Sequence, residues 1–263
     1  MTPKRHWISG RFQRDGVDLH YVRTGGSKPP FVLLHGLTGN GACWSPLART
    51  LQNEFDVVMP DARGHGNSSA PLHGYRYEDH AMDVIALIRH LALVAPVVLR
   101  HSMGGMTAAL VASRTANDIR SVILADPTFI SPQWQREVGD SDVADVHRHT
   151  LTLDKAAVVA QIQARHPHRS HEIVELLAQA RLQTRMSAFD VLTPPNPDYE
   201  RLVREIQVPI LLVIADGGVV SFDTARDLQK LNPLVRIERI HGAGHGIPFD
   251  QPERFEAAIR SSL

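Results

Sequence analysis

The fold is decided by the stretch Val97-Val98-Leu99-Arg100-His101-Ser102-Met103-Gly104-Gly105. Its apolar first part predicts a buried strand, and the small residues that run from Ser102 to Arg114 favour a helix directly after it. A serine between such elements lies at the tip of a tight turn, with its hydroxyl at the carboxyl edge of a sheet. The N–H groups and dipole of the following helix point toward that hydroxyl.

Similar apolar runs recur on both sides of this turn. We expect a hairpin within residues 11–24, turning at Asp15-Gly16, and strands over 31–34, 56–59, 97–99, 122–125, 210–214 and 235–240. Helical spacing lies between them, over 43–51, 78–91, 102–114 and 253–260. Apolar strands that alternate with helices predict an α/β fold, a mostly parallel sheet of about eight strands with helices on both faces.

The alternation stops between Pro127 and Ile206. This interval has no clear strand pattern, but it has helical patterns over 155–165 and 171–185 and ends near a Pro-rich segment, 193–197. We therefore predict three parts: a first core part (1–127), a helical insertion (128–205) and a second core part (206–263).

Composition favours a small-molecule partner. Lys plus Arg and Asp plus Glu number 28 each, so no net field attracts nucleic acid or an anionic membrane. The first ten residues lack the apolar run of a signal peptide, and no stretch has the roughly 18 apolar residues of a membrane span. We expect a cytoplasmic protein, monomer or homodimer, without a metal or organic cofactor. The single cysteine, Cys43, is expected to be packed rather than reactive.

Two further loops lie at expected strand ends. Gly242-Ala243-Gly244-His245 follows the last strand and can bring a histidine to the edge where Ser102 lies. The loop that begins at His35-Gly36 follows an earlier strand, and the N–H of Leu37 could join that of Met103 in an oxyanion hole. His35, Asp61 and His65 are interpreted as residues that hold their loops. Taken by itself, the serine motif at Ser102 does not identify a nucleophile, because serine also caps helices.

Taken together, these segments resemble the α/β-hydrolase family. The matching residues are 35–36, 61–68, 101–105, Asp216 and 242–245. The resemblance implies a serine nucleophile at Ser102, a general base at His245 and a helical cap over the site. It places the acid at Asp216, after the strand 210–215, while Asp126 at the end of the preceding strand is the alternative.

One residue departs from this family pattern. The family has glycine two residues before the nucleophile, and this chain has Arg100. Because the turn is crowded, an arginine there could be accommodated by a shifted neighbour, or it could reshape or disable the turn. A ligand-binding relative without turnover therefore stays open.

The resemblance implies hydrolysis of a carboxylic ester or lactone. We expect a small to medium apolar substrate and an acyl-enzyme on Ser102. Carbon–carbon bond hydrolysis or cofactor-free dioxygenation on a similar site are alternatives. The candidate pocket walls are Trp44, Phe129, Trp134, Met186 and Val219.

Overall fold

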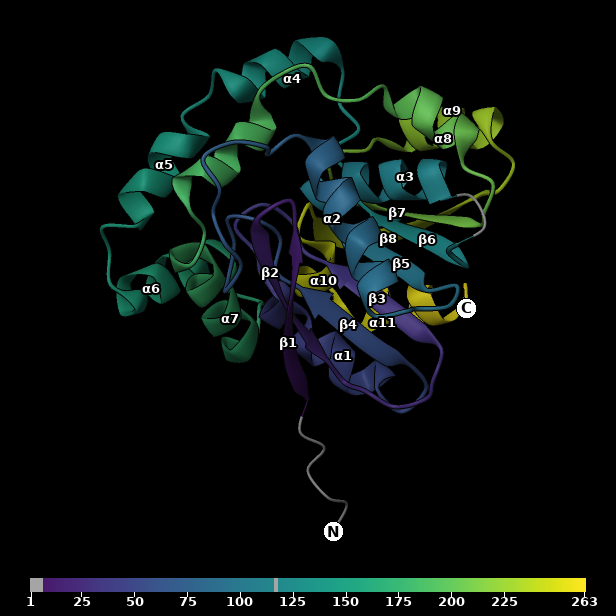
Figure 1. Cartoon of the computed structure of the whole chain (residues 1–263). Coiled ribbons are helices and arrows are strands. Elements are labelled where there is room, and N and C mark those ends of the chain that lie inside the picture. Colours follow the sequence, from purple (N-terminus) through teal and green to yellow (C-terminus); the bar gives the residue numbers. More distant parts are fainter. Residues whose placement is uncertain (1–6, 116–117) are drawn as a thin grey trace.

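The computed structural model describes residues 7–115 and 118–263. An eight-stranded sheet with the order β1-β2-β4-β3-β5-β6-β7-β8 runs through the molecule (Figure 1). The first two strands form an antiparallel hairpin and β2 pairs antiparallel with β4, whereas all the other pairs are parallel. The predicted fold class is confirmed. The strands are β1 (Ile8–Arg14), β2 (Val17–Arg23), β3 (Pro30–Leu34), β4 (Asp56–Pro60), β5 (Val97–His101), β6 (Ser121–Ala125), β7 (Ile210–Gly217) and β8 (Val235–Gly244).

The helices fall into a core set and an insertion set. The core helices are α1 (Ser45–Leu51), α2 (Tyr77–His90), α3 (Met103–Thr115), α8 (Tyr199–Glu205), α9 (Phe222–Leu231), α10 (Ile247–Asp250) and α11 (Pro252–Arg260). The insertion helices are α4 (Pro132–Gly139), α5 (Val143–Thr150), α6 (Lys155–Arg165) and α7 (His171–Leu182). Short 3-10 helices cover Gly41–Trp44 and Met186–Leu192.

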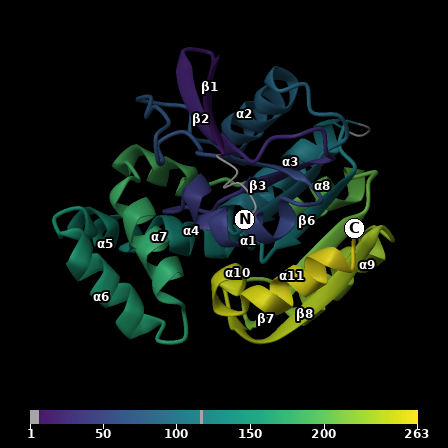
Figure 2. The same cartoon turned by 90° about the horizontal axis from the view of Figure 1, so that it is seen from below.

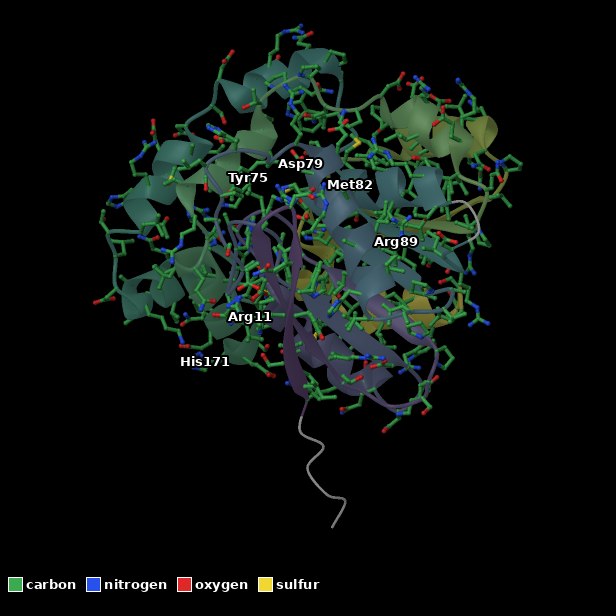
Figure 3. All side chains as sticks on the ribbon, in the orientation of Figure 1. Arg11, Tyr75, Asp79, Met82, Arg89 and His171 are labelled. Carbon is green, nitrogen blue, oxygen red and sulfur yellow. The ribbon has the colours of Figure 1, made fainter. Side chains whose placement is uncertain are left out.

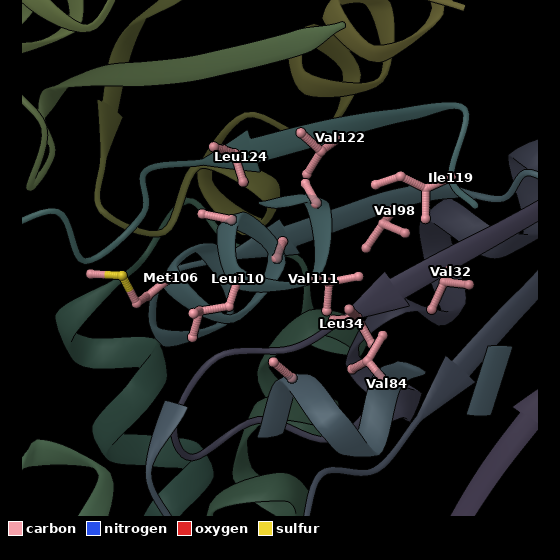
Figure 4. Close-up of a cluster of buried hydrophobic side chains, with 14 of the residues drawn as sticks. Val32, Leu34, Val84, Val98, Met106, Leu110, Val111, Ile119, Val122 and Leu124 are labelled. Atoms are coloured by element: carbon pink, nitrogen blue, oxygen red, sulfur yellow. The ribbon is translucent and has the colours of Figure 1, made fainter. Parts of the chain in front are cut away.

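Each face of the sheet has its own apolar layer. Successive residues of β3 alternate between the layers, because neighbouring side chains of a strand point to opposite faces: Val32 and Leu34 join one cluster, Phe31 and Leu33 the other. The first cluster packs under α2, α3, α8 and α9, and the second under α1 and α11. Figure 4 shows part of the first cluster, with side chains of α2 and α3 against the strands; it labels Val32, Leu34, Val84, Val98, Met106, Leu110, Val111, Ile119, Val122 and Leu124.

The insertion helices lie at one side of this core. Figures 1 and 2 both place α5, α6 and α7 together at one side of the sheet. The pair α6 and α7 has a small apolar cluster of its own, and His171, the exposed first residue of α7, is labelled in Figure 3. By contrast, α8 lies within the predicted insertion range but packs on the core, since Leu202 and Val203 join the first cluster.

Polar contacts hold the insertion against the core. Arg49 of α1 donates to Glu172 of α7 at 2.6 Å, and Asn40 donates to Gln183 at 2.9 Å. The amide of Arg185 donates to the carbonyl of Gly64 at 2.8 Å. The first bond holds the start of α7 against α1, and the other two hold the segment after α7 over the loops that follow β3 and β4. In the described part of the chain, no helix has the length and apolarity that crossing a bilayer requires.

Histidine burial makes stability depend on pH. Burial is the main cause that lowers the pKa of His35 to about 4 and those of His65 and His101 to about 3. These rings stay neutral in the folded protein, whereas the unfolded chain takes up protons below about pH 6.5. Because their pKa values are lower in the folded protein, their contribution to the free energy of unfolding is fully present above about pH 6.5. This contribution is lost as the pH falls toward 4.

We therefore expect the free energy of unfolding to fall by up to about 1.4 kcal/mol per pH unit for each of these histidines. Urea titrations at about pH 7.5, 6 and 5 measure it. His65→Asn should reduce the slope of the free energy of unfolding against pH by the contribution of one histidine. An equal free energy of unfolding at the highest and lowest pH would refute this account.

Candidate active site

Ser102 lies at a strained turn between β5 and α3. Its φ is +58°, a left-handed conformation that residues other than glycine rarely adopt. The turn is tied to the neighbouring strand, because the Ser102 amide donates to the carbonyl of Ala125 at 3.1 Å. It is crowded on the side of the loop after β3, where a Cβ on Gly36 would lie 3.1 Å from the Cβ of Ser102. The sequence motif has therefore folded into the predicted turn.

Arg100 does not disrupt this turn. Its side chain runs beneath α3, where a Cβ on Gly104 would lie 2.9 Å from Arg100 Nε. The absence of a side chain at Gly104 thus accommodates the arginine. Arg100 is 2% exposed and helps to line a small cavity with His80 and Asp83, away from Ser102.

The guanidinium of Arg100 lacks a compensating partner among the described residues. Its Nε and Nη1 are buried without a hydrogen bond. Asp83 is already engaged, since Arg63 donates to both of its oxygens at 2.7 Å and Arg14 donates at 3.0 Å. Burial lowers the pKa of Arg100 to about 9. A buried charge in this state costs free energy rather than supplying it.

A continuous hydrogen-bonded chain joins Ser102, His245 and Asp126. His245 Nε2 is 2.7 Å from Ser102 Oγ, and His245 Nδ1 is 2.5 Å from Asp126 Oδ2. Because a carboxylate only accepts, Nδ1 carries the hydrogen and Nε2 is left to accept from the serine. Asp126 has no exposed surface, and it also accepts from the amides of Val219 and Val220 at 2.8 to 2.9 Å.

The prediction that Asp216 holds His245 is wrong. Strand β7 continues through Gly217 beside β8, so Asp216 remains on the strand, where its side chain is 39% exposed. It accepts instead from Arg239 Nε at 2.9 Å and from the Gly242 amide at 3.0 Å. The loop after β7 contributes backbone amides to Asp126, and Gly218 permits that approach because a Cβ there would lie 2.7 Å from Asp126 Oδ1.

The loop after β3 runs beside Ser102. Leu37 lines the same cavity as Ser102, and Met103 is the first residue of α3. No hydrogen bond from either amide to another described group is found, so both remain available to an oxyanion as predicted candidates. His35 holds this loop, since its Nε2 accepts from the Ala62 amide at 3.0 Å and its Nδ1 donates to the Gly36 carbonyl at 2.8 Å.

His101 is a residue that the sequence analysis did not single out. Its Nε2 donates to the carbonyl of His245 at 2.6 Å, and its ring centroid lies 4.9 Å from that of His245. Burial lowers its pKa, so the ring is neutral at pH 7. His101 therefore fixes the backbone of the loop that carries His245. The signal in the sequence was its position directly before Ser102.

A cavity of about 630 Å³ adjoins Ser102 and His245. Its volume suits a small molecule. The core contributes Leu37, Trp44 and Phe249 to its lining, and the insertion contributes Leu177, Arg165, His166, His168, Arg169 and Arg181. The predicted wall was largely wrong, because of the five candidates only Trp44 lines this cavity. Cys43 also borders it, but burial raises the pKa of that thiol to about 12, so it stays protonated.

The other four candidates lie elsewhere. Phe129 stacks on Tyr199 with ring centroids 5.0 Å apart, while Trp134 and Val219 border a separate small hollow. Met186 begins the 3-10 helix after α7. Apolar character alone did not show which face of the insertion turns toward Ser102.

Among the described residues, no group of three or more His, Cys, Asp or Glu side chains is placed to hold a metal ion.

Comparison with known proteins agrees with this architecture. A family model for the alpha/beta hydrolase fold matches residues 29–252. The chain belongs to the α/β-hydrolase fold family. It is 28% identical to 2-(acetamidomethylene)succinate hydrolase of Mesorhizobium japonicum over 98% of this chain and 96% of that protein. It is 27% identical to N-formylmaleamate deformylase of Pseudomonas putida, with 97% and 96% covered.

A solved structure shows the same similarity in three dimensions. The crystal structure of E-2-(acetamidomethylene)succinate hydrolase superposes with a TM-score of 0.83 at 25% identity, covering 98% of this chain and 99% of that one. This α/β-hydrolase is thus similar over nearly its whole length to relatives named as a hydrolase and a deformylase.

Replacing Arg100 tests whether its charge is a burden to the fold. Arg100→Met keeps an apolar stem and removes the unpaired guanidinium, so the free energy of unfolding should rise by about 1–3 kcal/mol. Arg63→Met is the matched control: it leaves the buried Asp83 with Arg14 as its remaining ionic partner among the described residues and should lower stability by about 3 kcal/mol. Denaturant unfolding measures both. A clear loss of stability in Arg100→Met would show that the charge is compensated.

Proposed function

We propose that this α/β-hydrolase is a serine hydrolase that cleaves a carboxylic ester or lactone of a small molecule through an acyl-enzyme on Ser102. The observation that carries the proposal is the hydrogen-bonded chain from Ser102 Oγ through His245 to the buried Asp126, next to a cavity of substrate size. This arrangement supplies a nucleophile, a base within reach of its proton and a group that orients the base.

The proposed mechanism follows from these contacts. His245 Nε2 takes the proton of Ser102 as Oγ attacks the substrate carbonyl. The Leu37 and Met103 amides would stabilise the oxyanion, each donor contributing about 10²- to 10³-fold in rate. His245 then returns the proton to the leaving group, and water releases the acyl group by the same steps. Asp126 stabilises the imidazolium and keeps Nδ1 protonated.

The fixed geometry around His245 supports turnover. His101 holds the backbone of His245, and Asp126 is itself held by two amides. Little reorganisation is then needed when the proton moves. Arg100 leaves the turn at Ser102 intact, which argues against a relative that binds ligands without turnover.

An amide is a second candidate bond. The names of the two relatives describe N-acyl substrates, an acetamide and an N-formyl compound. The same acyl-enzyme chemistry serves an amide when His245 protonates the departing nitrogen.

Carbon–carbon bond cleavage uses a similar set of groups. A dioxygenase would instead require dioxygen, so turnover under nitrogen separates a dioxygenase from the hydrolytic candidates.

A fluorophosphonate probe tests the nucleophile directly. We expect one adduct per chain, located on Ser102 by peptide mass spectrometry, because His245 activates that hydroxyl. Ser102→Ala should abolish the adduct and His245→Ala should slow it by several orders of magnitude. A folded wild-type protein that is not labelled at Ser102 would overturn the proposal.

The identity of the acid is tested by a pair of substitutions. Asp126→Asn should lower kcat by about 10³- to 10⁴-fold, because the amide no longer holds the right tautomer of His245. Asp216→Asn is the control and should leave kcat within about twofold, since Asp216 contacts surface groups of β8. Ester hydrolysis by both variants, with circular dichroism to check folding, gives the answer. The reverse ranking would restore Asp216 as the acid.

A further inference from the structure

The insertion gives the cavity a basic wall. Arg165 is the last residue of α6, Arg181 lies in the last turn of α7, and Arg169 lies in the connection between these helices. All three border the cavity that also contains Ser102 and His245. The carboxylate that borders it is Asp250, so in the described structure three guanidinium groups face one acid. The wall of the cavity therefore carries an excess of positive charge.

The three arginines differ in how their charges are compensated. Arg169 donates to Asp250 at 2.8 Å, and its side chain is 8% exposed. For Arg165 and Arg181, no acidic side chain of the described residues lies within 4.0 Å, and neither makes a side-chain hydrogen bond to another described group. Arg165 is exposed and Arg181 is partly buried, and neither has an ionic partner within the described residues.

Their mutual repulsion gives the cavity an affinity for negative charge. Burial lowers the pKa of Arg181, and the charges of Arg165 and Arg169 lower it further. The three groups are therefore close enough to interact unfavourably. An anion placed between them would relieve this repulsion and be attracted by each group.

Arg169 connects this charged wall to the catalytic loop. A Cβ on Gly246 would lie 2.3 Å from Arg169 Nη2, so the arginine packs directly on the residue after His245. It also lies over the ring of Phe249, 5.8 Å from the centroid. Because Arg169 is paired and packed, it acts as a positioning residue, and the two unpaired arginines remain for a ligand.

We propose that Arg165 and Arg181 form a subsite for a carboxylate carried by the substrate, so that the preferred substrates are anionic. A guanidinium presents two parallel N–H groups that match the two oxygens of a carboxylate. Trp44, Leu177 and Phe249 provide apolar surface in the same cavity for the carbon chain between that carboxylate and the scissile bond. The inference rests on the proposed function of Ser102 and replaces the expectation of an apolar substrate.

The test compares two esters that differ in one charge. Mono-(para-nitrophenyl) succinate and para-nitrophenyl butyrate have four-carbon acyl chains and the same leaving group. We expect the wild-type enzyme to favour the succinate ester by about 10- to 100-fold in kcat/KM, the range for a charged hydrogen bond. Arg165→Gln and Arg181→Gln should each reduce this preference about tenfold, mainly through KM, and Arg181→Lys should restore part of it.

A surface arginine provides the matched control. Arg148 on α5 is exposed and pairs with Asp145, so Arg148→Gln should leave the ratio of the two kcat/KM values unchanged. Added salt should lower the wild-type preference, because it screens the attraction. A wild-type enzyme that favours the butyrate ester, or a preference that survives both Arg165→Gln and Arg181→Gln, would refute the subsite.

Binding measurements separate this inference from the proposed function. Calorimetry with succinate on Ser102→Ala needs no turnover, and binding should be lost when Arg165→Gln and Arg181→Gln are added. Succinate binding without fluorophosphonate labelling of the wild-type protein would keep the subsite and remove the hydrolase. Fluorophosphonate labelling of Ser102 without succinate binding and without a preference for the charged ester would keep the hydrolase and remove the subsite. Inorganic phosphate that binds more tightly than succinate would overturn the assignment to a carboxylate.

Discussion

The hydrogen bond between His245 and Asp126 joins residues 119 positions apart in the chain and brings three strand ends together. Asp126 follows β6, the amides that hold its carboxylate follow β7, and His245 follows β8. Because these strands are parallel neighbours, their carboxyl ends meet at one edge of the sheet. A buried carboxylate is costly unless it is hydrogen-bonded, so the loop after β7 is held around it. Ser102, at the end of β5, needs only the turn of its own strand to reach the same place.

Charge is placed in two different ways around this edge. In the core, Arg100 lies under α3 without a partner among the described residues, while its neighbour Arg63 is matched to Asp83. At the cavity, Arg169 is matched to Asp250, and Arg165 and Arg181 are not. Burial makes the first arrangement a cost to folding. The second faces a space that a ligand can enter, so the same lack of compensation can serve recognition.

The insertion contributes to the site mainly through the connection between α6 and α7 and through helix ends, with Leu177 of α7 adding apolar surface. Apolar residues of its helices α6 and α7 pack against one another in a cluster that includes Val158 and Val174. The basic residues that line the cavity come from the connection between the two helices and from their last turns, because basic side chains are favoured at helix carboxyl ends. The bond from Arg169 to Asp250 then fixes this connection against the loop of His245. A polar wall follows from how the insertion packs.

The sequence by itself determined the sheet, the turn at Ser102 and the histidine loop at His245, because apolar periodicity and glycine-rich turns are local properties of the chain. Only the tertiary structure decided between Asp126 and Asp216, since the length of β7 depends on its pairing with β8. It also decided the lining of the cavity. Phe129 and Trp134 matched Trp44 in character, but which residues of the insertion face Ser102 is set by contacts between segments distant in the chain, and local patterns do not encode them.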